Sequence, residues 1–188
     1  MGSDEPAVNL GDRAEETHDE RIVRVVVDLL RAAGLLNDAI GEHDEGIKAD
    51  AMELARSVAD VRRIAGEGKL AALLGLEGGH AIENSLDHLR EFYDRAIRYM
   101  TLTWSNTNDW ADAAKEETLV GMRHGGLTAF GEAVVHRMND LGMIVDLSHS
   151  AESTFWHVLR ISKAPVMASH SDAYALSPHF RTLKDEQI

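Results

Sequence analysis

The chain has 188 residues, of which 44% are hydrophobic, and this combination is typical of one globular domain with its own core. Its formal net charge of -13 argues against a nucleic-acid partner or an anionic membrane surface. Because the sequence has no cysteine, it excludes disulfides and thiolate ligands, so a metal site would consist of His, Asp and Glu. With no apolar run of membrane-spanning length and no signal peptide at its polar start, we expect a soluble, cytoplasmic protein.

The amino-terminal region predicts a tail that leads into the folded part of the chain. Residues 1–20 are acidic and polar, which favours a flexible tail, and residues 21–188 are expected to form a single α/β domain. Apolar residues from about Glu20 to Leu36 recur at helical spacing, although the Val-rich centre leaves a strand open as an alternative. Residues 37–50 are acidic and are expected to form a loop.

The first strong secondary-structure patterns follow this region. The sequence Ser57-Val-Ala-Asp60 resembles a capping box and predicts a helix that reaches about Ala65. Leu70–Leu76 is a continuous apolar run, typical of a buried parallel strand, and Glu77 follows it directly. Two glycines after Glu77 allow other backbone segments to approach closely.

The middle of the chain continues the alternation of helix and strand. Ser85 is a suitable cap for a helix that extends to about Arg98, and Tyr99–Thr103 reads as the next strand. The stretch Trp104–Gly126 is polar, contains two tryptophans and predicts a long loop, and loops of this length are more often functional than not. Leu127–Leu141 then predicts a helix that a glycine terminates.

A repeated triplet marks the next part of the chain. Two short apolar runs, residues 143–147 and 165–168, are each followed by Ser-His-Ser. Between them lies a helical pattern with Ser150 as the expected N-cap and a proline as its end. A strand–helix–strand unit makes the two strands parallel neighbours, so His149 and His170 should leave the same edge about one strand spacing apart. Paired imidazoles at such an edge suit a metal or a catalytic site.

Four predicted strands therefore alternate with helices, and each has a polar group at its carboxyl end. This order predicts a parallel sheet, either open or part of a barrel. No glycine-rich phosphate-binding motif follows any strand, which disfavours nucleotide binding. The last residues, His179–Ile188, predict the start of one more helix with Thr182 as its cap.

Glu77, His149 and His170 are the best candidates for a metal site. A carboxylate at the end of a strand can bridge two cations while the histidines ligate one of them, and zinc accepts both ligand types. The alternative is that Glu77 only caps a turn and that the two histidines bind nearby loops through hydrogen bonds. Three such groups at the ends of parallel strands favour the metal site.

Other acidic and imidazole side chains are weaker candidates. Asp146 lies inside a strand, where it either supports His149 or accepts hydrogen bonds from backbone donors, and we favour the second. Asp172 completes an H-x-D spacing with His170, but it falls beyond the strand end and is expected in a loop. His80 is left undecided. The other histidines are expected to be solvated: His18, His43, His88, His124, His136 and His157.

Several blocks in this order resemble the renal (membrane) dipeptidase family, the M19 metallopeptidases. They are LLGLEGGHAI, SLDHLREFYDRAIRYMTLTW, NDWADA, HGGLTAFGEAVVHRMNDLGMIVDLSHS, TFWHVLRISKAPVMASHS and RTLKDEQI. The resemblance covers roughly residues 57–188, and it is close from residue 69 onward.

The resemblance implies a partial (β/α)8 TIM barrel of the metal-dependent hydrolase type, without its first and last strands. It also implies a two-zinc site that hydrolyses dipeptides, including those with a D residue at the carboxyl end. Glu77 would be the catalytic, bridging carboxylate, and His149 and His170 would ligate the second zinc. Arg181 would bind the carboxylate of the dipeptide substrate.

Two departures from the family pattern suggest that the site is incomplete. The family has His after the sequence TLT, whereas this chain has Trp104, which cannot accept a proton or ligate zinc. No apolar strand followed by H-x-D precedes Glu77, although His43 and Asp44 could supply the missing ligands. We therefore expect one zinc or fewer and weak activity. The alternatives are a catalytically silent fragment or pseudoenzyme with a residual metal or partner site, and a barrel metallohydrolase acting on other small amides.

An unclosed barrel would also affect the surface of the protein. Its strand edges and inward-facing side chains Leu74, Leu102 and Val145 would be uncovered and could drive formation of a homo-oligomer. Alternatively, the predicted helix near Val25–Leu30 would cover them.

Overall fold

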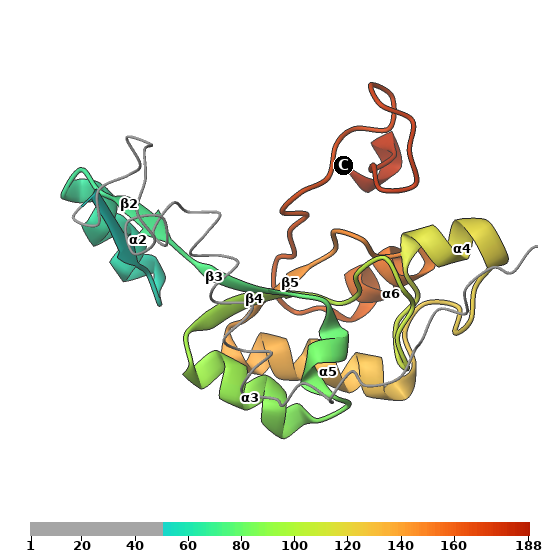
Figure 1. Cartoon of the computed structure of the whole chain (residues 1–188), viewed down its shortest axis with the longest axis horizontal. Helices are drawn as coiled ribbons and strands as arrows, with labels where there is room; N and C mark the ends of the chain where they lie inside the picture. The colour runs from blue at the N-terminus through green and yellow to red at the C-terminus, as the bar shows by residue number, and fades with distance from the viewer. Residues whose placement is uncertain (1–50) are drawn as a thin grey trace, which may run out of the picture.

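Residues 51–188 are described by a computed structural model, and a three-stranded parallel sheet lies at their centre (Figure 1). Its strands β3 (Leu74–Glu77), β4 (Ile97–Thr101) and β5 (Ile144–Asp146) occur in the order β3-β4-β5. Helices connect the consecutive strands, so the fold is mixed α/β. Within these residues no helix is long and apolar enough to cross a membrane. The predicted tail, first helix and acidic loop lie outside the described residues, as do His18, His43 and Asp44.

The register of the sheet aligns the polar ends of the strands. Glu77 pairs with Thr101, and Thr101 pairs in turn with Asp146. The predicted fourth strand, residues 165–168, is present only as a parallel bridge between Asp146 and Met167. The ladder stops there because the next backbone donor, Ser169 N, bonds to the side chain of Asp146. The expected parallel neighbour relation is thus confirmed, but the strand itself is much shorter.

The helices that flank the sheet begin where their caps predict. The hydroxyl of Ser85 accepts a hydrogen bond from His88 N and starts α3 (Leu86–Asp94). This helix ends earlier than predicted because Ala96 has a left-handed φ of 76°, and β4 consequently begins at Ile97. The next long helix, α5 (Ala129–Leu141), has Thr128 as its N-cap and the predicted glycine, Gly142, as its C-cap.

The helix between the two Ser-His-Ser triplets is α6 (Glu152–Ile161). Its N-cap is Ala151, which offers no side-chain hydrogen bond, so the prediction that Ser150 caps it was wrong. The Ser150 hydroxyl is instead buried and has no hydrogen-bond partner among residues 51–188. Tertiary packing, rather than a local cap, fixes the start of α6: Phe155 and Val158 are buried in the core.

The predicted strand Leu70–Leu76 is divided into two strands in different sheets. Its first half, β2 (Leu70–Ala72), pairs in parallel with β1 (Met52–Leu54), whereas its second half forms β3. Within β3, an irregularity between Leu74 and Gly75 shifts the register of its pairing with β4. Helix α2 (Val58–Gly66) joins β1 to β2 and has the predicted Ser57 cap. We did not predict β1, because three residues in an acidic context carry no periodic pattern.

The long predicted loop Trp104–Gly126 contains a short helix, α4 (Ala114–Val120). It has no side-chain cap, and Leu119 and Val120 at its end are exposed, so its sequence shows no amphipathic pattern. The loop is held by the buried carboxylate of Asp112. It accepts hydrogen bonds from three backbone N–H groups, those of Arg123, His124 and Gly126.

The core lies between the sheet and helices α3, α5 and α6. Figure 1 shows α3 and α5 on the same side of the sheet, with the carboxyl-terminal end on the opposite side. Leu102 and Val145 are buried in this core, so the expectation that they lie uncovered was wrong, while Leu74 is half-buried at its margin. They are buried because the connecting helices pack on them. The alternative cover, a helix near Val25–Leu30, lies outside the described residues.

The carboxyl-terminal segment, residues 162–188, is the least packed part of the described chain, and none of its residues is buried. It ends in a single 3-10 turn, η4 (Asp185–Gln187), whose N-cap residue is Lys184. The prediction that Thr182 caps a helix was therefore wrong. Its hydroxyl instead donates to the carbonyl of His179 and stabilises the preceding turn.

Candidate metal centre

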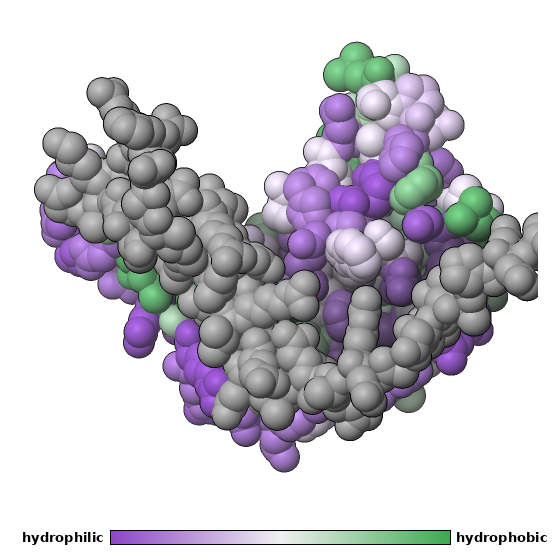
Figure 2. Space-filling model, viewed as in Figure 1, coloured by the Kyte–Doolittle hydropathy of each residue, from purple (hydrophilic) through white to green (hydrophobic). Residues whose placement is uncertain are grey.

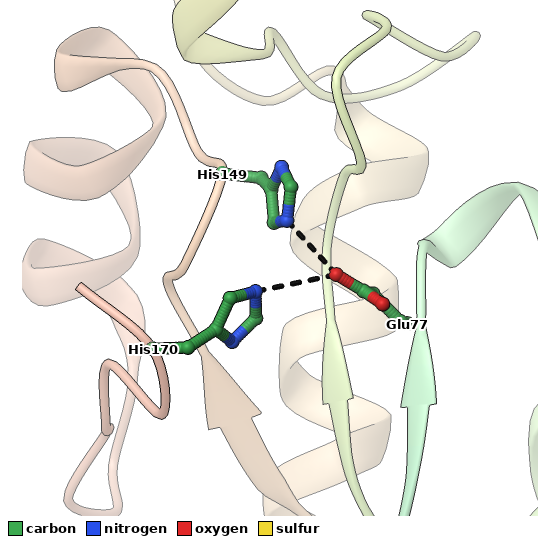
Figure 3. A group of neighbouring side chains, drawn as sticks. All are labelled: Glu77, His149 and His170. Carbon is green, nitrogen blue, oxygen red and sulfur yellow. Dashed lines mark hydrogen bonds and ion pairs between the residues drawn. The ribbon is translucent and has the colours of Figure 1, made fainter. Parts of the chain in front are cut away.

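Three side chains from distant parts of the chain converge at the carboxyl end of the sheet (Figure 3). Oε1 of Glu77 lies 2.9 Å from Nε2 of His149 and 3.2 Å from Nε2 of His170. One ligand atom from each of the three lies within 4.8 Å of the others. The two imidazole rings are 5.0 Å apart, as expected for histidines that follow neighbouring parallel strands.

Glu77 is positioned by the glycines that follow it. The backbone N–H of Gly78 donates a hydrogen bond of 2.6 Å to the Thr101 hydroxyl on β4. At Gly79 an added Cβ would lie 2.4 Å from the Trp110 ring and 2.6 Å from the Leu102 carbonyl. Only glycine fits there, so the turn after β3 packs tightly and directs the Glu77 side chain to the sheet edge.

His149 is held in place by burial in the protein core. It has a left-handed φ of 72° and is only 6% exposed. Burial lowers the pKa of His149, and the nearby Arg181 guanidinium lowers it further, while Glu77 opposes both effects. The lowered pKa favours the neutral imidazole, which is the form that ligates metals. Its Nδ1 is buried and makes no hydrogen bond within the described part of the chain.

His170 is held by hydrogen bonds from the end of β5. Its backbone N–H donates to the Ser148 hydroxyl, and its Nδ1 lies 2.7 Å from the Ser169 hydroxyl. Asp146 Oδ1 accepts hydrogen bonds from the backbone N–H groups of Ser148 and Ser169. The favoured prediction for Asp146, that backbone donors satisfy it, is thus confirmed. Its carboxylate also contacts the Ser169 hydroxyl.

Arg181 lies beside the same group of side chains. One of its Nη atoms donates to the backbone carbonyl of His170 at 3.1 Å, and its Nε is buried without a partner in residues 51–188. Burial lowers the pKa of Arg181, and the carboxylates of Glu77 and Asp146 oppose this. Arg181 and His149 both line a cavity of about 420 Å³. The structure therefore brings all four predicted site residues together.

The three converging groups fit a zinc ion. Zinc binds imidazole nitrogens at about 2.0–2.1 Å and carboxylate oxygens at about 2.0–2.2 Å, so two ligands of one tetrahedral ion lie about 3.3 Å apart. The two distances from Glu77 Oε1, 2.9 and 3.2 Å, are close to this separation. The donor set contains nitrogen and oxygen only, as a chain without cysteine requires.

Other predicted residues lie at the edge of this centre or away from it. Trp104 is 48% exposed, and its ring centroid lies 6.4 Å from that of His149. Trp104 and His80 both line a second hollow. Asp172 binds the backbone N–H of Ala173 and is not part of the metal-binding group, as its loop position predicted. His136 is exposed, as expected.

Three histidines expected to be solvated are instead partly buried and bonded. His157 accepts a hydrogen bond from Leu127 N, and its other ring nitrogen lies 3.1 Å from Glu132 Oε1. Rings of His88 and His124 contact backbone carbonyls, those of Ile82 and Asn108 respectively. The contacts of His124 and His157 span 16 and 30 residues, so local patterns gave no indication of them, whereas His88 bonds to a carbonyl only six residues earlier. Ser169 was also missed, although its place in the second Ser-His-Ser triplet could have indicated a role.

The sequence of this chain is similar to those of known dipeptidases. Residues 40–188 match the membrane dipeptidase family (peptidase family M19). The chain belongs to the M19 family. Dipeptidase aclJ of Aspergillus oryzae is 46% identical over 137 residues, which cover 71% of this chain and 32% of that protein. Mouse Dipeptidase 3 is 42% identical over 124 residues, 63% of this chain and 24% of that protein. The chain thus spans about a third or less of the length of these two M19 relatives.

Solved structures share the fold. A metallo peptidase from Rhodobacter sphaeroides, crystallised with a phosphinate mimic of the dipeptide L-Ala-D-Ala, is 32% identical with a TM-score of 0.65, over 74% of this chain and 40% of that one. The probable dipeptidase PvdM of Pseudomonas aeruginosa is 28% identical with a TM-score of 0.70, over 90% of this chain and 41% of that one. The described residues therefore have the mixed α/β fold of M19 dipeptidases.

Proposed function

We propose that this chain carries part of the active site of a zinc-dependent dipeptidase. The observation that carries the proposal is the convergence of Glu77, His149 and His170 on one point in a chain of the M19 family. The Rhodobacter sphaeroides relative binds a mimic of L-Ala-D-Ala, which supports dipeptides with a D residue at the carboxyl end as substrates. The parallel sheet would form part of a (β/α)8 barrel, in line with the 40% of that relative which the chain matches.

Each side chain has a role that follows from its position. Glu77, His149 and His170 would hold zinc, which lowers the pKa of a bound water and polarises a carbonyl. Arg181 would bind the substrate's terminal carboxylate, because a guanidinium fork fits a carboxylate with two parallel hydrogen bonds. The unpartnered Nε of Arg181 and its place in the cavity beside His149 support this role.

A catalytically silent metal-binding protein is the second candidate, and Trp104 favours it. An indole has only an N–H donor and cannot accept a proton, so this position contributes no acid–base chemistry. Its exposed ring beside His149 can provide an apolar surface and one N–H donor, but no base. In addition, residues 51–188 contain one group suited to a metal, whereas a two-metal mechanism requires ligands for two ions.

Zinc titration of the 188-residue chain, combined with a dipeptide hydrolysis assay and light scattering, tests both candidates. We expect the chain to bind zinc with no more than one ion per chain and to hydrolyse dipeptides far more slowly than a typical enzyme, and Glu77→Gln should weaken zinc binding. Zinc binding without any hydrolysis would favour the silent protein. Two zincs with enzyme-like turnover in a monodisperse monomer would contradict the incomplete site and direct attention to His43 and Asp44. Failure to bind zinc would reject the proposed function altogether.

A further inference from the structure

The hydrogen bonds behind His170 form a chain that starts at Asp146. The Asp146 carboxylate is fully buried at the end of β5, and it accepts hydrogen bonds from two backbone N–H groups and contacts the Ser169 hydroxyl. A carboxylate only accepts hydrogen bonds, so the single hydroxyl proton of Ser169 must point toward Asp146. The hydroxyl oxygen then keeps two lone pairs for further contacts, and the longer of these contacts is with the Ser148 hydroxyl at 3.5 Å.

The shorter of these contacts is with His170. Its Nδ1 lies 2.7 Å from the Ser169 oxygen, which can only accept because its proton is already donated. In its neutral form, an imidazole that faces an acceptor through Nδ1 carries its proton on that atom, which leaves Nε2 bare. Nε2 is the atom that faces Glu77 Oε1 at 3.2 Å. Two lone pairs at this distance repel each other, and a cation bound to both relieves the repulsion.

We propose that Asp146, acting through the Ser169 hydroxyl, holds His170 in the tautomer that presents its bare Nε2 to the metal. Asp146 and Ser169 are thus positioning residues for the zinc centre, and this role rests on the proposed function. The contacts resemble the carboxylate partners that orient metal-bound histidines in other proteins, with a serine inserted between carboxylate and imidazole.

Within the described residues, the other histidine of the centre, His149, has no such hydrogen-bond chain behind it. Its Nδ1 has no hydrogen-bond partner among residues 51–188, whereas burial in the core holds that ring. His170 lies in a segment without buried residues and its side chain is 44% exposed, so packing does not fix the ring. The hydrogen-bond chain replaces packing as the means of orientation.

Two substitutions change the hydrogen bonds between Asp146, Ser169 and His170 in different ways. Ser169→Ala removes the hydroxyl, so His170 should populate both tautomers. Asp146→Asn replaces an acceptor by an amide donor, and the Ser169 proton should then turn toward His170 Nδ1. This reversal should move the imidazole proton to Nε2, where it blocks ligation. Ser169→Thr keeps a hydroxyl and should retain the original tautomer.

Long-range proton–nitrogen NMR spectra of the imidazole rings report the tautomer in the metal-free chain, and chelator competition measures zinc affinity. Ser169→Ala should weaken zinc binding about 10–100-fold, the usual effect of losing such a partner. The matched control is Ser153→Ala, which removes a serine hydroxyl that is buried and for which residues 51–188 supply no hydrogen-bond partner. It should leave both readouts unchanged, and Asp146→Asn should show the reversed tautomer.

The outcomes separate this inference from the proposed function. If Ser169→Ala keeps both the wild-type tautomer and the wild-type zinc affinity, the positioning role is overturned, even if Asp146→Asn fails to fold. A wild-type His170 protonated at Nε2 would overturn it as well. If the tautomers change as expected but the wild type binds no zinc, the hydrogen-bond assignment stands and the zinc-dependent function is rejected.

Discussion

The two histidines of the metal centre are held by different physical means. His149 follows β5 in the packed core and is 6% exposed. Glu77 is the last residue of β3 in the same sheet. His170 and Arg181 belong to residues 162–188, where no described residue is buried. Figure 2 shows hydrophobic atoms exposed at the tip of this segment, which agrees with the exposure of Leu176. One half of the site thus depends on packing, and the other on hydrogen bonds.

This difference indicates how the two halves should respond to mutation. Core packing is cooperative, so damage to the first half should unfold the sheet and remove the whole centre. Hydrogen bonds to an exposed segment can break locally, so damage to the second half should affect ligand binding while the sheet remains folded. The following substitutions test this contrast.

The largest expected effect is on the stability of the packed half. Phe92 on α3 is 1% exposed, so Phe92→Ala should lower the free energy of unfolding by about 3–5 kcal/mol, through lost burial and a cavity. Phe180 in the exposed segment is 38% exposed, and Phe180→Ala should cost about 0.5 kcal/mol or less. Urea unfolding followed by circular dichroism measures both. Equal losses for the two variants would contradict the contrast.

The next effect concerns substrate binding by the exposed half. Arg181→Ala should weaken dipeptide binding to the zinc-loaded chain by about 1.5–3 kcal/mol, the range for hydrogen bonds to charged groups, without changing thermal stability. Arg181→Lys keeps the charge but loses the planar fork, so its loss should be intermediate. Calorimetric titration with a dipeptide measures the affinity, and Arg160→Ala on the exposed face of α6 is the control. Unchanged binding by Arg181→Ala would remove this residue from the site.

A smaller loss should follow from Gly79→Ala at the junction of sheet and site. The new methyl group would collide with the Trp110 ring and the Leu102 carbonyl, and the overpacking should cost about 1–3 kcal/mol. Because Gly79 lies two residues after Glu77, zinc affinity should fall as well. Gly66→Ala is the matched control, since nothing lies within 4 Å of its added methyl group. A variant with full stability and full zinc affinity would show that the turn after β3 is not tightly packed.

The smallest effect should come from the ion pair that ties the two halves together. Lys184 in the exposed segment lies 2.6 Å from Glu152 on α6, and it holds the pKa of Glu152 below its ordinary value. A carboxyl group whose pKa is lower in the folded state stabilises the fold at pH values above its unfolded-state pKa. This stabilisation is lost as the pH falls through the folded-state pKa. Glu152→Gln should therefore melt slightly earlier than the wild type at neutral pH, and the difference should vanish in acid. A difference that grows in acid would contradict the ion pair.

The sequence by itself determined the features that depend on nearby residues. Ser57 and Ser85 each bond to an N–H three residues later, and such caps can be read locally. The alternation of apolar runs with helical patterns likewise indicated parallel strands. Since carboxyl ends of parallel strands share an edge, the convergence of Glu77, His149 and His170 could be predicted as well.

Only the tertiary structure decided the features that depend on distant partners. The division of residues 70–76 between two sheets follows from pairing with β1 and β4, and neither partner is indicated by the run itself. The Ser169 hydroxyl gains its role from Asp146, 23 residues away, and His157 is ordered by Leu127, 30 residues away. Local patterns record the preferences of a short segment, whereas these contacts exist only once the chain has folded and brought separate segments together.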